Sequence, residues 1–378
     1  MDALMAIPSV PDLGPAHWVP RSDRRVLFPF NRTGLELTYL GRNAVWWAAR
    51  LLGLEGWEVI VPAYHHGVEI AALLHAGARL RFARVDASGR MDPDDVRSRV
   101  GPRTRAIYVI HYAGFPQPLE ELAEVARGCG VFLIEDCALS LFSREADRPL
   151  GSRGDAAIFC FYKTLPVPHG GGLLMRECRE AGPMALTPPP LLPTLSHLTG
   201  SMLMAAERRS QGTGRLLRGV TKSFTCHVRA MARLEDVPVG TQDFDPSVVH
   251  FGMSAVAERV LRNVDADEVV RRRRANWLHL HERIGRPERA TWSSLPPGVC
   301  PLFYALEVDD KDRALRLLWS RGIQAVDFWR SGHPAATCEH FPEVTALRQR
   351  VVELPCHQGL GPEDIEHVAR VAREALET

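Results

Sequence analysis

The stretch that decides the fold is AIYVIHYAGFPQPLEELAEVARGCGVFLIED, residues 106–136. It begins with an apolar run at Ala106–Ile110, passes into an amphipathic segment at Leu119–Cys129 and ends in a second apolar run at Val131–Ile134. Both runs are continuously apolar, as expected of strands that are covered by helices on both faces. A strand, a helix and a second strand in this order predict a parallel βαβ unit.

The same alternation continues on both sides of this unit, from about residue 41 to residue 175. Further strands are expected at Glu58–Val61, Arg79–Ala83, Ala156–Phe161 and Gly172–Met175. Further helices are expected at Ala44–Leu52, Val68–Ala76 and Pro93–Val100. The predicted fold class is therefore α/β, with a mostly parallel sheet.

Changes in composition along the chain suggest its domain organisation. Residues 1–40 are expected to form an N-terminal arm, and residues 41–245 a large α/β domain. This domain includes an insertion at about 177–245, which is first proline-rich and then mixes Leu, Val and Phe with Arg. Residues 246–378 predict connecting helices and a small α+β C-terminal domain. The RRRR run at 271–274 is interpreted as a solvated helix face.

Composition argues against several classes of protein. Lys+Arg 46 against Asp+Glu 45 leaves a net charge of +1, so the chain lacks the overall field that would hold nucleic acid. The eight cysteines form no CxxC pair and no metal-ligand spacing, so neither a metal centre nor a disulfide scaffold is expected. The sequence contains neither a run of 18 apolar residues nor a recognisable signal peptide, and we expect a cytoplasmic protein.

Lys163 is the first candidate for chemistry. Lysine occurs only at positions 163, 222 and 311, and all other basic residues are arginines. Lys163 follows an apolar strand directly and precedes the glycines 170–172, which are expected to let the backbone approach a ligand. An amine at this place suits imine formation, which arginine cannot perform.

Polar residues also end or follow two other predicted strands, and a further set opens a helix. Glu135 and Asp136 end the strand of VFLIED, at the sheet edge where ligands bind in open α/β folds, although Asp136 could instead cap a helix. Gly41, Arg42 and Asn43 open a helix, where a phosphate is favoured, although Asn43 could be an ordinary N-cap. Tyr64, His65 and His66 follow a strand and could stack on a planar ligand.

Seven segments together resemble the DegT/DnrJ/StrS family of pyridoxal phosphate-dependent sugar aminotransferases. They are GRNA, VIVPAYHHGVEIAALLHAGA, RFARVDASGRMDPDDV, AIYVIHYAGFPQPLEEL, VFLIEDCA, GDAAIFCFYKTLPVPHGGG and VVELPCHQGLGPEDIEHV, in the family's order. The resemblance covers roughly residues 41–175 and 250–378. It implies the type I aminotransferase fold with a seven-stranded sheet, a small C-terminal domain, pyridoxal 5'-phosphate as cofactor and a homodimer with shared active sites.

The resemblance also implies roles for individual residues. Lys163 matches the lysine that forms the internal aldimine (a Schiff base), and Asp136 the acid that pairs with the pyridinium nitrogen. Gly41, Arg42 and Asn43 match the turn that receives the cofactor phosphate. His66 falls where the family has an aromatic residue over the ring, and His250 where it has an asparagine that reaches the neighbouring subunit's phosphate.

Departures from the family concern the cofactor's surroundings. Leu139 stands where a glutamine is common, and the stretch before Lys163 is two residues shorter than usual. The serine that helps to hold the phosphate has no clear match, and Ser140 or Tyr162 could substitute for it.

The expected activity is transfer of an amino group from an amino acid, glutamate by analogy, to a keto-sugar linked to a nucleotide. The alternatives are a cyclitol or other non-nucleotide acceptor, and a non-catalytic regulatory or membrane-associated protein of the same fold. We expect the insertion to cover the site entrance and shape the acceptor pocket. Its basic, apolar half within 184–245 could instead rest on a membrane surface.

Overall fold

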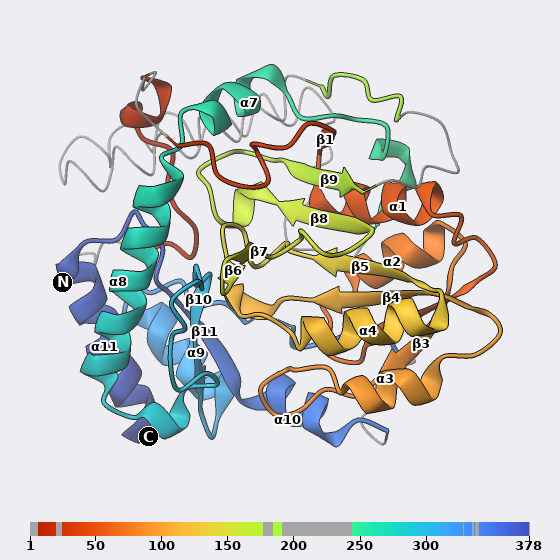
Figure 1. The fold of residues 1–378 in the computed structure, drawn as a ribbon. Helices are drawn as coiled ribbons and strands as arrows, with labels where there is room; N and C mark the ends of the chain where they lie inside the picture. The colour runs from red at the N-terminus through yellow and green to blue at the C-terminus, as the bar shows by residue number, and fades with distance from the viewer. Residues whose placement is uncertain are drawn as a thin grey trace.

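A computed structural model describes residues 7–19, 25–176, 184–190, 244–327, 329–334, 336 and 340–377. Its centre is a seven-stranded sheet in the order β1-β9-β8-β5-β4-β2-β3 (Figure 1). The bounds in that order are β1 (Leu35–Thr38), β9 (Gly171–Met175), β8 (Ala156–Cys160), β5 (Phe132–Asp136), β4 (Thr104–Ile110), β2 (Glu58–Pro62) and β3 (Arg79–Ala83). Strands β3, β2, β4, β5 and β8 are parallel, whereas β9 and β1 are antiparallel to their neighbours.

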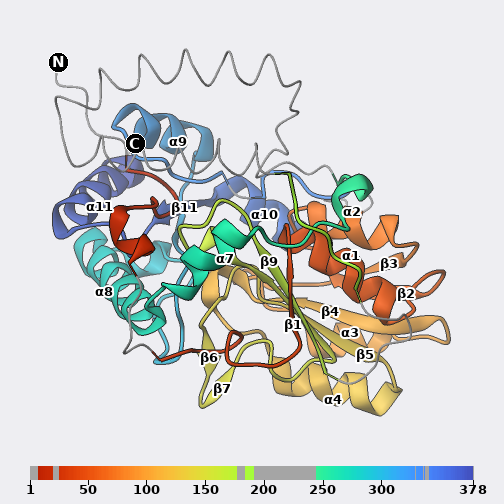
Figure 2. The ribbon, with the colours of Figure 1, turned by 90° about the horizontal axis from the view of Figure 1, so that it is seen from above.

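Helices cover both faces of this sheet, as the continuous apolar strands predicted. They are α1 (Gly41–Leu51), α2 (Val68–His75), α3 (Pro93–Arg99) and α4 (Leu119–Cys129). Helices α1 and α2 lie together on one face, and α3 and α4 on the other (Figures 1 and 2). Strands β2 and β8 are buried at every residue, because both faces lie under helices. The predicted α/β class with a mostly parallel seven-stranded sheet is confirmed.

The C-terminal region forms a second lobe beside the sheet. A two-stranded antiparallel sheet of β10 (Phe303–Glu307) and β11 (Val351–Pro355) is accompanied by the helices α8 (Ala266–Ile284), α9 (Lys311–Ser320), α10 (Pro342–Arg350) and α11 (Pro362–Glu377). Helix α11 packs on α8 and on α9 (Figure 1). Trp277 and Leu280 of α8 are buried with Ile365 and Val368 of α11 in one apolar core.

The segment expected to be an N-terminal arm takes part in both lobes. Strand β1 pairs with β9 at the edge of the large sheet, and Ile7 forms a bridge with Ile323 of the small lobe. A short 3-10 turn, η1 (Pro15–Trp18), lies between them in sequence and contacts α7 (Ala255–Arg262).

Two of the glycines after Lys163 lie beside the edge strand of the large sheet. Gly171 and Gly172 open β9 and pair with Thr38 and Leu37 of β1. A Cβ on Gly171 would lie 2.5 Å from the backbone of Leu40, and one on Gly172 2.7 Å from the ring of Phe161. Protein atoms therefore surround the positions that side chains would take at Gly171 and Gly172. The expected approach of a ligand to the backbone of these glycines stays a prediction.

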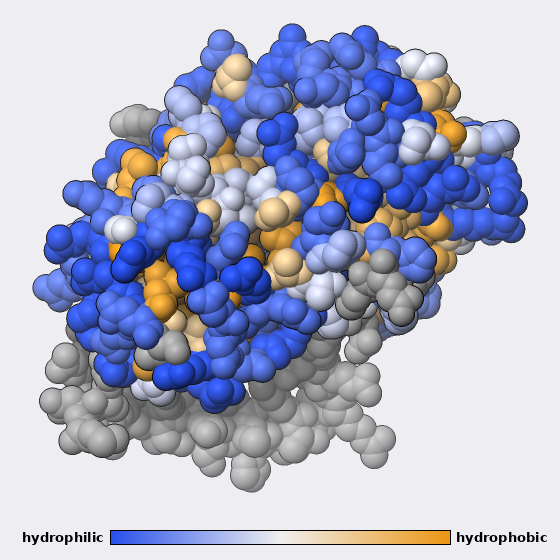
Figure 3. Space-filling model, turned by 90° about the horizontal axis from the view of Figure 1, so that it is seen from below, coloured by the Kyte–Doolittle hydropathy of each residue, from blue (hydrophilic) through white to orange (hydrophobic). Residues whose placement is uncertain are grey.

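No helix among the described residues is long and apolar enough to cross a bilayer. Seen from below, the face is largely hydrophilic, with hydrophobic side chains gathered toward its centre (Figure 3). Most of the 177–245 insertion lies outside the described residues, so its expected roles stay predictions.

Candidate functional site

Asp136 ends β5 at the carboxyl edge of the parallel strands, where the β4–β5 register sets it opposite Ile110. Its Oδ2 accepts a hydrogen bond from the Tyr108 hydroxyl at 2.6 Å, and its Oδ1 accepts one from the Ala138 N–H at 2.8 Å. Burial raises the pKa of Asp136, and the Tyr108 hydrogen bond opposes this rise. The carboxyl is therefore a buried group whose charge would be favoured by a positive partner.

Glu135 points to the opposite face of β5 and holds a loop. Its Oε1 accepts hydrogen bonds from the N–H groups of Arg153 at 2.8 Å and Gly154 at 2.6 Å. Its Oε2 accepts one from the Gly151 N–H at 2.7 Å and contacts His111 Nε2 at 3.2 Å. Although burial opposes ionisation, His111 and the N–H groups keep the pKa of Glu135 below its usual value. Of the two adjacent acids, Glu135 makes four contacts that hold a loop, whereas Asp136 accepts two hydrogen bonds.

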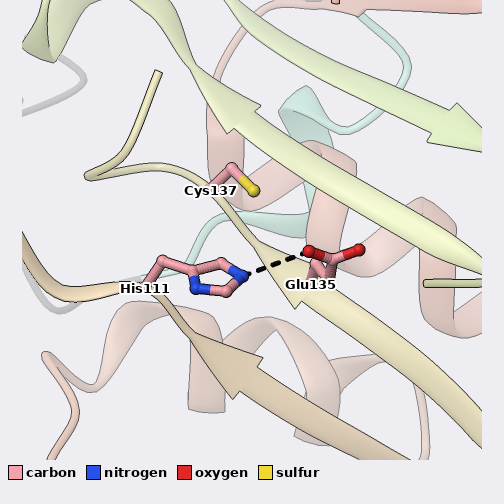
Figure 4. Close-up of side chains that lie close together, drawn as sticks. All are labelled: His111, Glu135 and Cys137. Atoms are coloured by element: carbon pink, nitrogen blue, oxygen red, sulfur yellow. Dashed lines mark hydrogen bonds and ion pairs between the residues drawn. The ribbon is translucent and has the colours of Figure 1, made fainter. Parts of the chain in front are cut away.

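His111, Glu135 and Cys137 form a buried cluster with the spacing of metal ligands (Figure 4). The Gln117 N–H donates to His111 Nδ1 at 3.2 Å, so the imidazole proton lies on Nε2 and faces Glu135. Burial raises the pKa of Cys137 well above its usual value, which favours the thiol over the thiolate. The imidazole and the carboxylate are thus saturated by hydrogen bonds, and the cluster is explained as a structural network.

Lys163 ends the 3-10 turn η3 (Phe161–Lys163), which continues directly from β8. The charge of half-buried Lys163 acts to lower the pKa of four nearby groups, which for three of them opposes the larger effect of burial. These groups are Asp136, Glu69, His66 and Cys160. The carbonyl of the next residue, Thr164, accepts hydrogen bonds from Arg273 at 3.0 Å and Gln358 at 2.9 Å. The chain around Lys163 is therefore held from the second lobe.

Arg273 corrects the interpretation of the RRRR run. Its side chain is 1% exposed and also donates to the carbonyls of Pro301 and Leu302. One arginine of the run is thus a buried link between α8 and the Lys163 turn, while Arg271 is exposed and pairs with Glu268.

The N-terminus of α1 adjoins this turn. Helix α1 begins at Gly41 after Leu40, and no described side chain caps it. A Cβ on Gly41 would lie 3.0 Å from the Cβ of Cys160, so a larger residue would push the helix away from the end of β8. The buried Arg42 contacts the Tyr162 hydroxyl. Of the two residues considered for the missing serine, Tyr162 is at this place, whereas Ser140 contacts the Cys137 thiol.

Asn43 is neither a cap nor turned toward Lys163. It lies inside α1, its N–H donates to the Leu40 carbonyl, and its side-chain amide donates to the Val248 carbonyl at 2.7 Å. Its direct contact with a cofactor stays a prediction.

His66 precedes α2 and faces the same space as Lys163. Burial, with Lys163 and Arg42 nearby, lowers the pKa of His66 to about 3, so the ring is neutral at pH 7. His65 points away: its Nδ1–H donates to the Pro62 carbonyl and its Nε2 accepts from the His333 N–H at 2.9 Å. A neutral ring at position 66 suits stacking on a planar ligand.

A loop of the second lobe covers this region. Trp329 packs its ring 4.7 Å from that of Tyr64 and 5.1 Å from that of Tyr112. Arg348 holds the loop by donating to the carbonyls of Trp329 and His65. The two lobes therefore meet beside His66.

Two further predicted residues are placed differently. His250 is exposed and packs its ring 4.1 Å from that of Phe251, which leaves it available to another molecule; its role in a neighbouring subunit stays a prediction. Leu139 is buried in the core, 4% exposed, so it supplies no polar contact where the family has glutamine.

Sequence reasoning missed Tyr108, Glu69 and Arg348. Tyr108 lies in an apolar run that was interpreted only as a strand, although it is two residues before the end of the strand that pairs with β5. Glu69 falls in the first turn of the expected helix Val68–Ala76, and it was not singled out from the sequence. Arg348 is one of many arginines, and no local signal distinguishes it.

The residues present fit the cofactor that the resemblance implies. A buried acid, an amine that perturbs it, a neutral imidazole and a helix N-terminus without a side-chain cap converge on one space. An acid, an amine and an anion site are what a pyridinium nitrogen, an aldehyde and a phosphate require.

Comparison with known proteins supports this assignment. The family model of the DegT/DnrJ/EryC1/StrS aminotransferase family matches residues 41–181. GDP-perosamine synthase of Escherichia coli O157:H7 is 33% identical over 141 residues, which are 36% of this chain and 39% of that protein. The UDP-N-acetyl-3-dehydro-alpha-D-glucosamine 3-aminotransferase of Acidithiobacillus ferrooxidans is 25% identical over 354 residues, 89% of this chain and 82% of that protein.

A solved structure shows the same fold over most of the chain. The aminotransferase TlmJ from Streptoalloteichus hindustanus superposes with a TM-score of 0.64 at 24% identity, covering 91% of this chain and 86% of that one. With the first curated relatives the alignments span only a third to two fifths of their length. The matched segment, residues 41–181, contains Gly41, His66, Asp136 and Lys163. Over this segment the chain is similar to the DegT/DnrJ/EryC1/StrS aminotransferase family.

Proposed function

We propose that this protein is a pyridoxal phosphate-dependent aminotransferase that moves an amino group from glutamate to a nucleotide-linked keto-sugar. The observation that carries the proposal is the convergence of Lys163 and Asp136 at one edge of the sheet, beside the N-terminus of α1. The family match at residues 41–181 supports amino transfer, and the names of its relatives support a sugar acceptor. When bound, the cofactor supplies the electron sink for the reaction.

Asp136 would accept a hydrogen bond from the ring nitrogen and hold a proton there. Burial raises the pKa of this carboxyl, so a positive nitrogen would favour its ionised form. Tyr108 orients the group through its 2.6 Å hydrogen bond.

Lys163 would hold the cofactor covalently and, once displaced by the donor, move a proton with its Nζ as general acid and base. Arg273 and Gln358 hold the Thr164 carbonyl, which limits the space that the amine can explore. Precise placement of this kind is what proton transfer requires.

Arg42, with the backbone N–H of Gly41, would bind the phosphate at the start of α1. His66 would cover the ring face as a neutral imidazole. We further propose a cytoplasmic homodimer in which His250 of each subunit approaches the phosphate of the other site.

The test begins with purified protein incubated with pyridoxal 5'-phosphate. Borohydride reduction followed by peptide mapping should find the modification at Lys163, with Lys222 and Lys311 as internal controls. Glutamate should then change the visible spectrum of unreduced wild-type protein and leave that of Lys163→Ala unchanged. A panel of keto-sugar nucleotides and free cyclitol ketones should regenerate the initial spectrum only with the former.

Modification of Lys222 or Lys311 would overturn the site. Regeneration by a cyclitol ketone alone would replace the nucleotide-linked acceptor with the second candidate. Stable cofactor binding without any response to amino donors would favour a non-catalytic protein of this fold.

A further inference from the structure

A cavity of about 550 Å³ opens at the edge of the large sheet opposite the proposed active site. Residues 131–133, where β5 begins, form one of its walls. Asp155 directly precedes β8, and Arg176 directly follows β9, which runs antiparallel to β8. Since Asp136 ends β5 and Lys163 follows β8, the cavity lies at the amino ends of the same two strands. Its volume is within the range of about 300–1,000 Å³ that small-molecule sites occupy.

Four arginines from separate parts of the chain line this cavity. Arg127 belongs to the last turn of α4, Arg148 to a two-residue strand, and Arg153 and Arg176 to connecting segments. Two of them are engaged: Arg153 pairs with Glu120, and Arg176 donates to the Arg153 carbonyl at 3.0 Å. The side chains of Arg127 and Arg148 make no hydrogen bond and no ion pair with any residue that the structure describes. Two guanidinium groups are therefore left for a ligand.

The charges around the cavity do not cancel. Glu120 and Asp155 are the acids that line it, so four arginines and two carboxylates leave a net charge of +2. Asp155 accepts a hydrogen bond from a backbone N–H of β5 at 2.8 Å. The pKa of Glu120 is lowered first by its hydrogen bond with Arg153 and further by Arg148 and Arg127, so all three guanidinium groups lie near one carboxylate. A ligand with two negative charges would balance this excess.

An apolar wall adjoins these charges. Ala123 and Ala126 of α4 and Phe132 of β5 line the cavity. The end of α4 would explain Arg127 alone, because a cation is favoured at a helix C-terminus. It does not explain three further arginines from other elements around the same space. Apolar side chains beside a few converging polar groups are typical of small-molecule sites.

We propose that this cavity is a second binding site, for a small phosphate ester with a planar apolar group. The guanidinium groups of Arg127 and Arg148 bind the phosphate oxygens, which paired N–H donors match in geometry. The phosphate, with about two negative charges at pH 7, offsets the net charge of the cavity. The organic group lies against Ala126 and Phe132. The site does not rest on the proposed function, because none of its residues belongs to the proposed active site.

The test uses purified protein that is loaded with pyridoxal 5'-phosphate and then freed of excess cofactor, with adenosine 5'-monophosphate as the probe. Phenylglyoxal modifies exposed arginines, and mass spectrometry of peptides gives the rate at each position. At a probe concentration of about ten times its Kd, the rates at Arg127 and Arg148 should fall about tenfold, because only the free site reacts. Arg373 of α11 is the matched control: it is exposed, makes no hydrogen bond or ion pair with the described residues, and should react at an unchanged rate.

Calorimetry provides the second readout. A double variant with Arg127→Gln and Arg148→Gln should bind adenosine 5'-monophosphate at least about tenfold more weakly, since hydrogen bonds to a charged group are lost. Arg373→Gln should bind it like the wild type. All three side chains are exposed, so these variants should fold normally. The wild type should bind inorganic phosphate more weakly than the nucleotide, because phosphate lacks the apolar group, and it should bind adenosine more weakly still.

Equal modification rates with and without the nucleotide, or equal protection of Arg373, would overturn the proposal and leave the arginines as a solvated surface. Equal affinity for inorganic phosphate or for adenosine would overturn the assigned ligand class. Unchanged affinity in the double variant would place the nucleotide elsewhere on the protein and overturn this site. Failure of the proposed function is seen separately, as wild-type protein in which borohydride traps no cofactor on Lys163.

Discussion

Glu135 and Asp136 are adjacent acids, yet their neutral variants should fail in different ways. In Glu135→Gln, one carboxylate oxygen becomes an NH₂ group, which faces donors rather than acceptors. If the NH₂ replaces Oε1, the N–H groups of Arg153 and Gly154 lose their partner; if it replaces Oε2, the Gly151 N–H and His111 lose theirs. Each buried donor left unsatisfied costs about 1–3 kcal/mol, so two of them cost about 2–6 kcal/mol.

Asp136→Asn should keep most of the stability. The Asn oxygen can still accept from the Ala138 N–H, and its NH₂ can donate to the Tyr108 hydroxyl, which both donates and accepts. We expect a loss of less than about 1 kcal/mol in the free energy of unfolding. The rate of the glutamate half-reaction should fall instead, because an amide cannot stabilise the proton on the ring nitrogen.

Urea unfolding of both cofactor-free variants, followed by circular dichroism, measures the first effect. The rate of the glutamate half-reaction at saturating cofactor, in the folded fraction, measures the second. Glu135→Gln should lose stability and keep most of its rate, and Asp136→Asn should do the reverse. A Glu135→Gln variant within about 1 kcal/mol of wild type would refute the assigned role of the N–H groups.

Three other predictions concern pH, assembly and the insertion. The pKa of His65 is lowered to about 3 by burial, so the unfolded chain binds more protons between about pH 3 and 6.5 and stability falls as pH falls through that window. Protonation of His65 on unfolding lowers the free energy of unfolding by about 4 kcal/mol across this window. His65→Gln should make the free energy of unfolding less dependent on pH there, and an unchanged dependence would contradict the prediction. Mixed subunits of Lys163→Ala and His250→Ala should regain activity if the sites are shared; exchange without recovery would argue against sharing. Replacing residues 184–240 with a flexible link should preserve the donor half-reaction and abolish the acceptor half-reaction. If both half-reactions were preserved, the insertion would not shape the acceptor pocket.

The elements of the large sheet were predictable because their signals are local. Leu119–Cys129 is helical over the predicted range, and the strand at Arg79–Ala83 also agrees at both ends. Helix α1 starts at Gly41, three residues before the predicted Ala44. Its first turn has no capping side chain and packs against Cys160 at the end of β8, so no local sequence signal marks its start. Strand β1 was missed because Leu35–Thr38 is a short edge strand preceded by irregular chain.

For the proposed site, the sequence by itself singled out the two residues that we expect to carry the chemistry. Lys163 stands out by its rarity and its place after a strand, and Asp136 by its place at the end of another strand. Both signals are local, and the parallel topology that brings strand ends to one edge follows from the βαβ pattern. The sequence alone showed only that the side chains of Asp136 and Glu135 point to opposite faces of the strand, and it did not show what each of them contacts.

Only the tertiary structure decided which groups surround these two. Arg273 looked like one of four solvated arginines until α8 was seen to bury it against Thr164, and Tyr108 looked like a strand residue until β4 was paired with β5. Arg348 donates to the His65 carbonyl although the two residues stand 283 positions apart in the sequence. The physical reason is that burial and electrostatics depend on distance through space, whereas the patterns that mark helices and strands depend on neighbours along the chain.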